Sequence, residues 1–162
     1  MTIRTLAAAL LASALTTAVA ETPAAYPFSI QLTLSEKLVA ELTAKNETVI
    51  VAAYFYGEPN EKGQSEIDDM GYIQLGEERT EIPPASGLVP VNGVVDPAKV
   101  ALLATPVSVN VNVFSGRKSS EDNLISCDFI DGPVADLGTA PVEISCGLIT
   151  ENPVTVHKPA KG

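Results

Sequence analysis

Strict alternation of apolar and polar residues constrains the fold of this chain more than any other feature. Residues 107–113 read VSVNVNV, so every second side chain is valine and those between are serine or asparagine. A period of two is typical of a β-strand with one buried face. Residues 28–34, 124–130 and 142–149 show the same pattern, and prolines and glycines lie between these segments. The chain is therefore predicted to form short strands joined by turns.

Residues 48–56 differ from the other predicted strands because both of their faces are apolar. The two faces carry Val49, Val51, Ala53 and Phe55 on one side and Ile50, Ala52, Tyr54 and Tyr56 on the other. A strand of this kind is expected to be covered on each side. We expect the first face to meet an opposing sheet. The second face is expected to lie under a helix predicted at residues 36–45, with Ser35 as its N-cap, or against a partner.

The number and spacing of the predicted strands indicate the fold class. Residues 72–75 and 79–82 are predicted as strand segments on either side of a turn, and residues 88–95 as a weaker strand. About six to eight short strands punctuated by prolines predict an antiparallel β-sandwich, with two short helices in the connections. Its general shape is expected to be similar to immunoglobulin or transthyretin domains. The cysteine spacing is too short for the immunoglobulin disulfide, and the chain has no tryptophan.

The first twenty residues have the pattern of a secretory signal. Arg4 gives a positive start, a short apolar segment follows, and residues 18–20 read AVA, a typical cleavage site. We therefore expect residues 1–20 to be a cleaved signal peptide, residues 21–150 a single β-sandwich domain, and residues 151–162 a flexible C-terminal tail. The protein is expected to be secreted or periplasmic, and the alanine-rich signal favours a bacterial envelope.

The predicted location decides how the two cysteines, Cys127 and Cys146, are interpreted. In an oxidising compartment an even number of cysteines favours pairing, and two allow only one bond. Each shares a predicted strand face with large apolar residues, so a buried disulfide between the last two strands or between the two sheets is expected. Such a bond would stabilise the fold by roughly 3 kcal/mol. A metal pair or a nucleophilic thiol is the alternative.

The acidic charge excludes several classes of partner. The formal net charge is −10, and removal of Arg4 would make the domain more acidic. Such a surface repels phosphate backbones and anionic headgroups, and no basic stripe offsets it. We therefore expect no nucleic-acid binding. No segment after the signal is long and apolar enough to predict membrane insertion.

The residues that most catalytic sites require are missing from the sequence. The only histidine, His157, lies in the predicted tail, and no zinc-binding, nucleotide-binding or nucleophile-elbow motif is present. We therefore expect a protein that is not an enzyme and holds no cofactor or metal. Two weaker alternatives remain. The acidic loop at residues 57–71 has oxygen ligands for a cation such as Ca²⁺, although not in EF-hand order. A pair of carboxylates could also hydrolyse a glycoside.

The best candidates for a recognition surface are Ile50, Tyr54 and Tyr56, because aromatic side chains on an outward sheet face often mark interfaces. The alternative is that the first helix covers them. The sequence thus predicts a non-catalytic binding or structural protein that acts through protein–protein contacts, with another protein or a second copy as partner. An acidic cation- or carbohydrate-binding module is the alternative, and a carboxylate-based hydrolase is less favoured.

Overall fold

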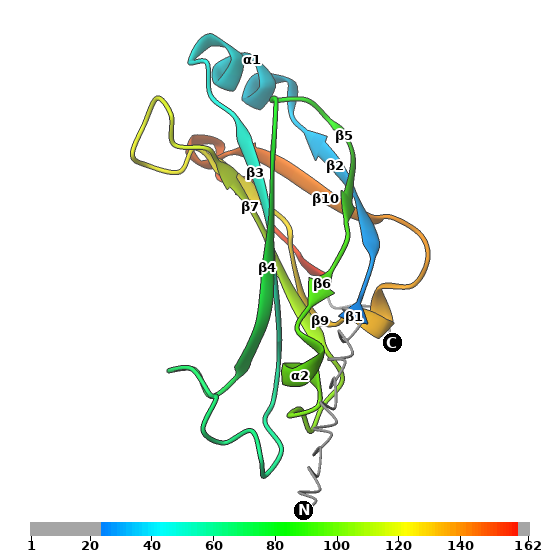
Figure 1. Cartoon of the computed structure of the whole chain (residues 1–162). Helices are drawn as coiled ribbons and strands as arrows, with labels where there is room; N and C mark the ends of the chain where they lie inside the picture. Colours follow the sequence, from blue (N-terminus) through cyan, green and yellow to red (C-terminus); the bar gives the residue numbers. More distant parts are fainter. Residues whose placement is uncertain (1–23, 159–162) are drawn as a thin grey trace, which may run out of the picture.

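Two β-sheets packed face to face form the protein, which we describe from a computed structural model for residues 24–158 (Figure 1). The five-stranded sheet has the order β11–β9–β7–β3–β4 and contains β3 (Val49–Gly57), β4 (Ile73–Ile82), β7 (Ser108–Ser115), β9 (Phe129–Pro133) and β11 (His157–Lys158). The four-stranded sheet has the order β5–β2–β10–β8 and contains β2 (Phe28–Leu34), β5 (Gly87–Val91), β8 (Ile125–Cys127) and β10 (Val142–Leu148). The predicted β-sandwich is confirmed.

Short elements complete the architecture. A two-stranded sheet pairs β1 (Ala24–Ala25) with β6 (Val94–Val95). The helices are α1 (Glu36–Ala44) and α2 (Pro97–Val100), and two 3-10 turns, η1 (Val134–Leu137) and η2 (Ile149–Glu151), flank β10. The two predicted helices are therefore present, and the strand count exceeds the prediction because β1, β6 and β11 have only two residues each.

Strand direction is mostly antiparallel, with two exceptions. In the middle of the four-stranded sheet, β2 and β10 are parallel, and Ile30 lies beside Val142. At one edge of the five-stranded sheet, β11 is parallel to β9. The chain reaches β10 from β9 through η1, a crossing from one sheet to the other that delivers β10 in the same direction as β2.

The alternating residues fill the space between the sheets as their pattern predicts. Buried side chains come from the inward faces of β2, β3, β7 and β10, and Phe55 is the largest of them, with 1% of its surface exposed. The four valines predicted to face inward from residues 107–113 are all buried. Apolar burial of this extent is the main force that holds the two sheets together.

A β-bulge joins the two segments that the sequence placed on either side of a turn. Phe55 on β3 faces Gly76 on β4, whereas the next residue, Tyr56, faces Gln74, so Leu75 is an extra residue in β4. The strand runs without interruption through residues 73–82, which corrects the predicted turn. The extra residue shifts the alternation, so Gln74 and Glu77, three residues apart, both pair with outward-facing tyrosines of β3.

Helix α1 closes one end of the sandwich (Figure 1). The hydroxyl of Ser35 accepts a hydrogen bond from the Leu38 backbone N–H, as predicted for an N-cap. Leu38 and Leu42 are fully buried, and the main packing partner of the helix is β10. The helix ends in a Schellman motif, in which Asn46 has φ 52° and the N–H of Glu47 bonds to the carbonyl of Leu42.

The predicted disulfide is confirmed. Cys127 on β8 and Cys146 on β10 are directly opposite each other on neighbouring antiparallel strands, and their sulfur atoms are bonded. The bond therefore lies within the four-stranded sheet rather than between the two sheets. It ties the short edge strand β8 to the centre of that sheet.

The two predicted terminal segments fall partly or wholly outside the described residues. The signal peptide predicted at residues 1–20 lies outside them. Of the predicted tail, residues up to Lys158 are described, and β11 pairs with β9. The buried Asp128 carboxylate accepts a hydrogen bond from the Val156 backbone N–H and forms an ion pair with Lys158 at 3.2 Å. No helix among residues 24–158 is long and apolar enough to cross a membrane.

Candidate functional site: the tyrosine groove

The outward face of the five-stranded sheet carries a row of side chains that the strand register brings together. Tyr54 on β3 pairs with Glu77 on β4 and with Asn110 on β7, and Asn110 pairs in turn with Asp131 on β9. In the neighbouring row, Tyr56 pairs with Gln74. Side chains opposite one another on adjacent strands lie close enough to interact directly. Residues from four strands therefore meet on one surface.

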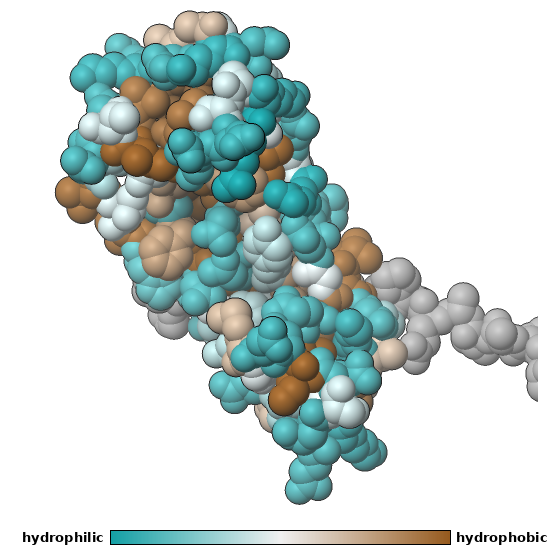
Figure 2. Space-filling view, turned by 90° about the vertical axis from the view of Figure 1, so that its left-hand side faces the viewer, coloured by the Kyte–Doolittle hydropathy of each residue, from teal (hydrophilic) through white to brown (hydrophobic). Residues whose placement is uncertain are grey.

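This face holds an open groove of about 590 Å³, which we call the tyrosine groove. Its lining residues are Tyr54, Tyr56, Met70, Tyr72, Gln74, Asn110, Asn112 and Asp131. A volume of this size lies within the range of pockets for small ligands, roughly 300–1,000 Å³. Figure 2 views the molecule from this side and shows hydrophobic residues in separate spots rather than one continuous patch. The groove combines aromatic rings with uncharged polar groups.

Helix α1 does not cover the tyrosines. It packs at the end of the sandwich against β10, so the expectation that it would lie over Tyr54 and Tyr56 is not what the structure has (Figure 1). Both tyrosines are half-buried. The apolar outward face of residues 48–56 is therefore explained only in part by packing within the chain.

The ring of Tyr56 is fixed by two contacts. Its hydroxyl donates a hydrogen bond to Oδ1 of Asp131 at 2.6 Å, and its ring meets the Tyr72 ring edge-on with 5.0 Å between centroids. Burial, the hydrogen bond to Asp131 and the negative charge of that carboxylate raise the pKa of Tyr56 above its ordinary value. The phenol therefore stays protonated at neutral pH, and its hydrogen bond to Asp131 persists.

A tight turn places Tyr72 and Met70 beside the sheet. The Asp68 carboxylate accepts hydrogen bonds from the backbone N–H groups of Met70 and Tyr72 and from the side-chain amide of Gln74. The Gln74 bond, followed by the Tyr72 bond, lowers the pKa of Asp68. These hydrogen bonds to Asp68 fix the end of the acidic loop next to β4. Met70, which is 78% exposed, lies at the rim of the groove.

Amide groups supply most of the polar lining. Asn110 and Asn112 project from the outward face of β7, and the Asn112 amide donates a hydrogen bond to the side-chain oxygen of Asn110. Gln74 projects from β4 on the other side of the tyrosines. Each amide can donate and accept hydrogen bonds at once. These groups suit a ligand that presents both donors and acceptors.

Two smaller hollows adjoin the groove, and each shares two of its residues. One of about 280 Å³ shares Tyr56 and Tyr72 and continues toward Thr105 and Pro133. The other, of about 340 Å³, shares Tyr54 and Gln74 and reaches the β4 edge of the sheet. Each hollow therefore borders the groove at a tyrosine. This arrangement can take an extended ligand.

The three residues that the sequence singled out do not form one site. Tyr54 and Tyr56 line the tyrosine groove, whereas Ile50 lies in a separate hollow of about 320 Å³ near the opposite end of β3. In that hollow the Arg79 guanidinium lies over the Phe114 ring, 5.3 Å from its centroid. We therefore restrict the candidate site to the tyrosine pair and its neighbours.

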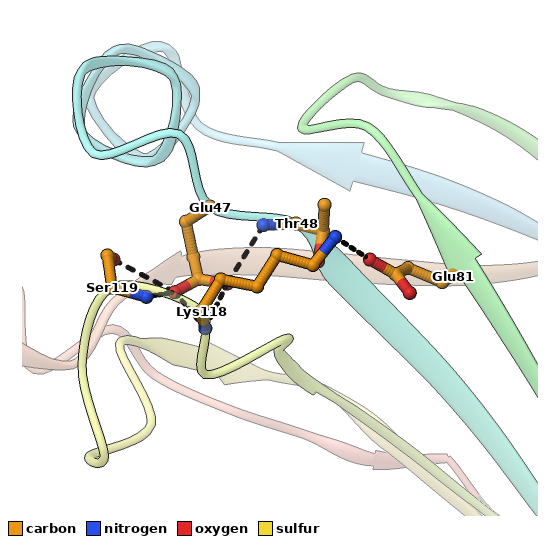
Figure 3. Close-up of polar contacts among 5 residues, drawn as sticks. All are labelled: Glu47, Thr48, Glu81, Lys118 and Ser119. Atoms are coloured by element: carbon orange, nitrogen blue, oxygen red, sulfur yellow. Dashed lines mark hydrogen bonds and ion pairs between the residues drawn. The ribbon is translucent and has the colours of Figure 1, made fainter.

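A buried carboxylate, Glu47, anchors the loop after β7 at the other end of the sheet (Figure 3). Only 2% of its surface is exposed, and its oxygens accept hydrogen bonds from the backbone N–H groups of Thr48, Lys118 and Ser119 and from the Ser119 hydroxyl. Burial acts to raise the pKa of Glu47, but these donors outweigh it and hold the pKa at about 2. Lys118 also forms an ion pair with Glu81.

Because donors within the chain already bind both oxygens of Glu47, its role is structural. A Cβ at position 116 would lie 2.1 Å from the Thr48 hydroxyl, so only glycine fits where the loop approaches β3. With several donors on its two oxygens, the carboxylate is an internal anchor rather than a ligand-binding group. Within residues 24–158, no three His, Cys, Asp or Glu side chains are placed to hold a metal ion together, and this includes the described acidic loop at residues 57–71.

The chain matches no protein-family model, no curated protein and no solved structure.

Sequence reasoning found two members of the groove and missed the others. The outward positions of Asn110 and Asn112 follow from the alternation of residues 107–113, so their direction was predictable. Their position beside the tyrosines depends on β7 being the neighbour of β3, which no local pattern shows. Tyr72 and Asp131 reach the site through a loop and through the β7–β9 pairing, and they carried no sequence signal of their own.

Proposed function

We propose that this chain is a non-catalytic binding protein that acts outside the cytoplasm, and that its ligand lies in the tyrosine groove. The observation that carries the proposal is a groove on a sheet face, lined by tyrosines that are held in place before any ligand arrives. Aromatic rings together with a few placed polar groups are the usual lining of a binding site.

The polar groups of the groove support binding rather than hydrolysis. Among residues 24–158, Asp131 is the only carboxylate in its lining, and one of its oxygens already accepts a hydrogen bond from the Tyr56 hydroxyl. Glycoside hydrolysis by the usual routes needs two carboxylates that flank the same bond. His157 stacks on Phe129 with 4.8 Å between ring centroids and is not among the groove residues.

The Cys127–Cys146 bond supports an oxidising location. Together with the signal pattern of residues 1–20, it favours a periplasmic or secreted protein. The acidic charge, −10 over the chain, disfavours nucleic acids and anionic membrane surfaces as ligands.

Backbone NMR can test the proposed site while the ligand is still unidentified. We expect envelope or culture-medium fractions, added to the ¹⁵N-labelled protein, to shift amide signals of residues 54–56, 70–74, 108–112 and 131. The signals of residues 29–33 and 143–147, in strands β2 and β10 of the other sheet, serve as the internal control. Shifts confined to those control residues, or no shifts with any fraction, would contradict the proposal.

A further inference from the structure

The lining of the tyrosine groove indicates a class of ligand, and this step depends on the proposed function. We infer that the ligand is a neutral carbohydrate chain of several sugar units. A sugar ring presents C–H groups on its faces and hydroxyls around its rim, so it needs both aromatic surface and amide partners. Tyr54, Tyr56 and Tyr72 offer the aromatic surface, and Asn110 and Asn112 offer amides that donate and accept.

The charge of the groove favours a neutral ligand over a charged one. No lysine or arginine among residues 24–158 lines it, and the chain as a whole is acidic, so a phosphorylated, sulfated or uronic-acid ligand would meet repulsion. Asp131 is the single carboxylate of the lining and is held by Tyr56. Two more carboxylates, Glu58 and Glu77, lie in the adjoining hollows, and Glu77 shares its hollow with Lys99. A basic peptide is therefore the competing ligand in the experiment below.

The shape of the depression favours a chain over a single sugar. The groove borders two further hollows, one at Tyr56 and Tyr72 and the other at Tyr54 and Gln74. A polymer of similar units can place successive rings in successive hollows and stack against the tyrosines that border them. A lone monosaccharide would fill only one part of this depression.

The residue types of the lining, aromatic rings and amides rather than aliphatic side chains, favour a carbohydrate over a folded protein partner. Stable protein interfaces bury about 800 Å² on each partner around an apolar centre. None of the described leucine, isoleucine or valine residues lines the groove, and the hydrophobic residues that Figure 2 shows on this side are interrupted by polar ones. A hydroxyl-rich ligand is better matched to alternating rings and amides.

The groove is also ordered before binding. The hydrogen bond from Tyr56 to Asp131, the Tyr56–Tyr72 contact and the Asn112–Asn110 bond hold these five lining residues in one arrangement. Fewer side chains then lose freedom when the ligand arrives, which strengthens binding of a flexible saccharide. The ring of Tyr54 borders both the groove and one adjoining hollow, as the ring of Tyr56 borders the groove and the other hollow.

Isothermal titration calorimetry with defined oligosaccharides tests the inference. The neutral probes are cellohexaose, chitohexaose, maltohexaose and mannohexaose; the charged probes are hexagalacturonate and hexalysine. We expect at least one neutral hexamer to bind, and its disaccharide to bind about tenfold more weakly or worse. The charged probes are expected to give no heat of binding above dilution. Failure of all four neutral hexamers would overturn the inference, and a disaccharide as tight as its hexamer would overturn the extended ligand.

Variants locate the binding on the groove. Tyr54→Ala is expected to weaken hexamer binding by about tenfold or more, and Tyr54→Phe to retain most of it, because the ring makes the contact. Phe114→Ala is the matched control, since Phe114 is a half-buried aromatic residue on the same sheet face but in a different hollow. An equal loss in Phe114→Ala and Tyr54→Ala would contradict a site in the groove. Asn112→Ala offers a second, smaller substitution with the same expected direction.

These experiments test the carbohydrate ligand and the position of the site separately. Binding of hexalysine alone, lost in Tyr54→Ala, would overturn the carbohydrate ligand and leave the groove as a binding site. Neutral hexamers that bind with full strength to Tyr54→Ala and to Asn112→Ala would place the carbohydrate elsewhere and contradict both proposals.

Discussion

The two outward faces of the sandwich differ more than any other pair of regions in the molecule. The face of the four-stranded sheet carries mainly small or flexible polar side chains, such as Gln31, Thr33, Glu143 and Ser145, and Leu88 beside Gln31 is an exposed apolar residue among them. The face of the five-stranded sheet carries tyrosines, asparagines and a groove. Both sheets need the same kind of inward face, because both contribute to one apolar core. Only the outward faces are free to differ, so they indicate what each side of the protein meets.

The largest expected effect distinguishes inward from outward residues on the same strand. Phe55→Ala removes a large buried ring and is expected to lower the free energy of unfolding by about 4 kcal/mol. Tyr54→Ala, one residue away on the outward face, is expected to lower it by no more than about 1.5 kcal/mol. Urea unfolding followed by circular dichroism measures both. Equal losses would mean that Tyr54 is part of the packing, and the contrast between faces would not hold.

The second prediction tests whether the two sheets are independent in function. Reduction of Cys127–Cys146, or the double substitution Cys127→Ser and Cys146→Ser, is expected to cost roughly 3 kcal/mol, because the bond constrains the unfolded chain. The disulfide lies in the four-stranded sheet, so ligand binding at the groove is expected to persist wherever the reduced protein is still folded. Calorimetry of the reduced protein measures this. A loss of binding with retained circular dichroism would show that the groove depends on the opposite sheet.

The third prediction concerns acid stability at the loop end of the five-stranded sheet. Since the pKa of Glu47 is held at about 2, below its unfolded value, its contribution is present above about pH 4.5 and is lost as the pH falls toward 2. The contribution is expected to be at most about 3 kcal/mol. The difference in unfolding free energy between wild type and Glu47→Gln should therefore shrink between pH 4.5 and 2.

The carboxyls of Asp68, Glu81 and Asp128 also have lowered pKa values, so they contribute to the same acid range in both proteins. The comparison of variants removes their common effect. A difference between wild type and Glu47→Gln that stays constant from pH 6 to pH 2 would show that the Glu47 charge is not what holds the loop.

The smallest expected effect lies on the polar outward face. Gln31→Ala and Thr33→Ala are expected to change the unfolding free energy by less than about 0.5 kcal/mol each and to leave ligand binding unchanged. Both residues project from β2 away from the core. A marked loss of binding in either variant, measured with the same hexamers, would mean that the two faces do not differ in function.

The sequence allows much of the fold to be predicted, because the fold depends on local periodicity. The alternation of residues 107–113 gives both the strand β7 and its buried face, and the Ser35 N-cap gives the start of α1. The Cys127–Cys146 bond follows from having only two cysteines. Residues 76–78 were misassigned to a turn because a bulge shifts the alternation in β4, and a shift of period looks like a break when one strand is considered alone.

The site was less predictable than the fold because it depends on strand neighbours. Tyr54 and Tyr56 stood out as apolar residues on an outward face, but Ile50 had the same local signal and lies in another hollow. Asp131 enters the groove because β9 pairs with β7, and the parallel β2–β10 pair was equally absent from any local pattern. Long-range pairing decides these contacts, and periodicity carries no information about it.

The parallel pairing of β2 with β10 affects how the chain can fold. Strand β10 lies between β2 and β8, so the four-stranded sheet remains in two separate parts until residues 142–148 are available. During synthesis, which starts at the N-terminus, β2 is therefore made early. Its second neighbour, β10, is made only after most of the other strands. Contacts between such distant segments slow folding. Closure of the four-stranded sheet and formation of the Cys127–Cys146 bond therefore depend on the same late strand, β10, which carries Cys146.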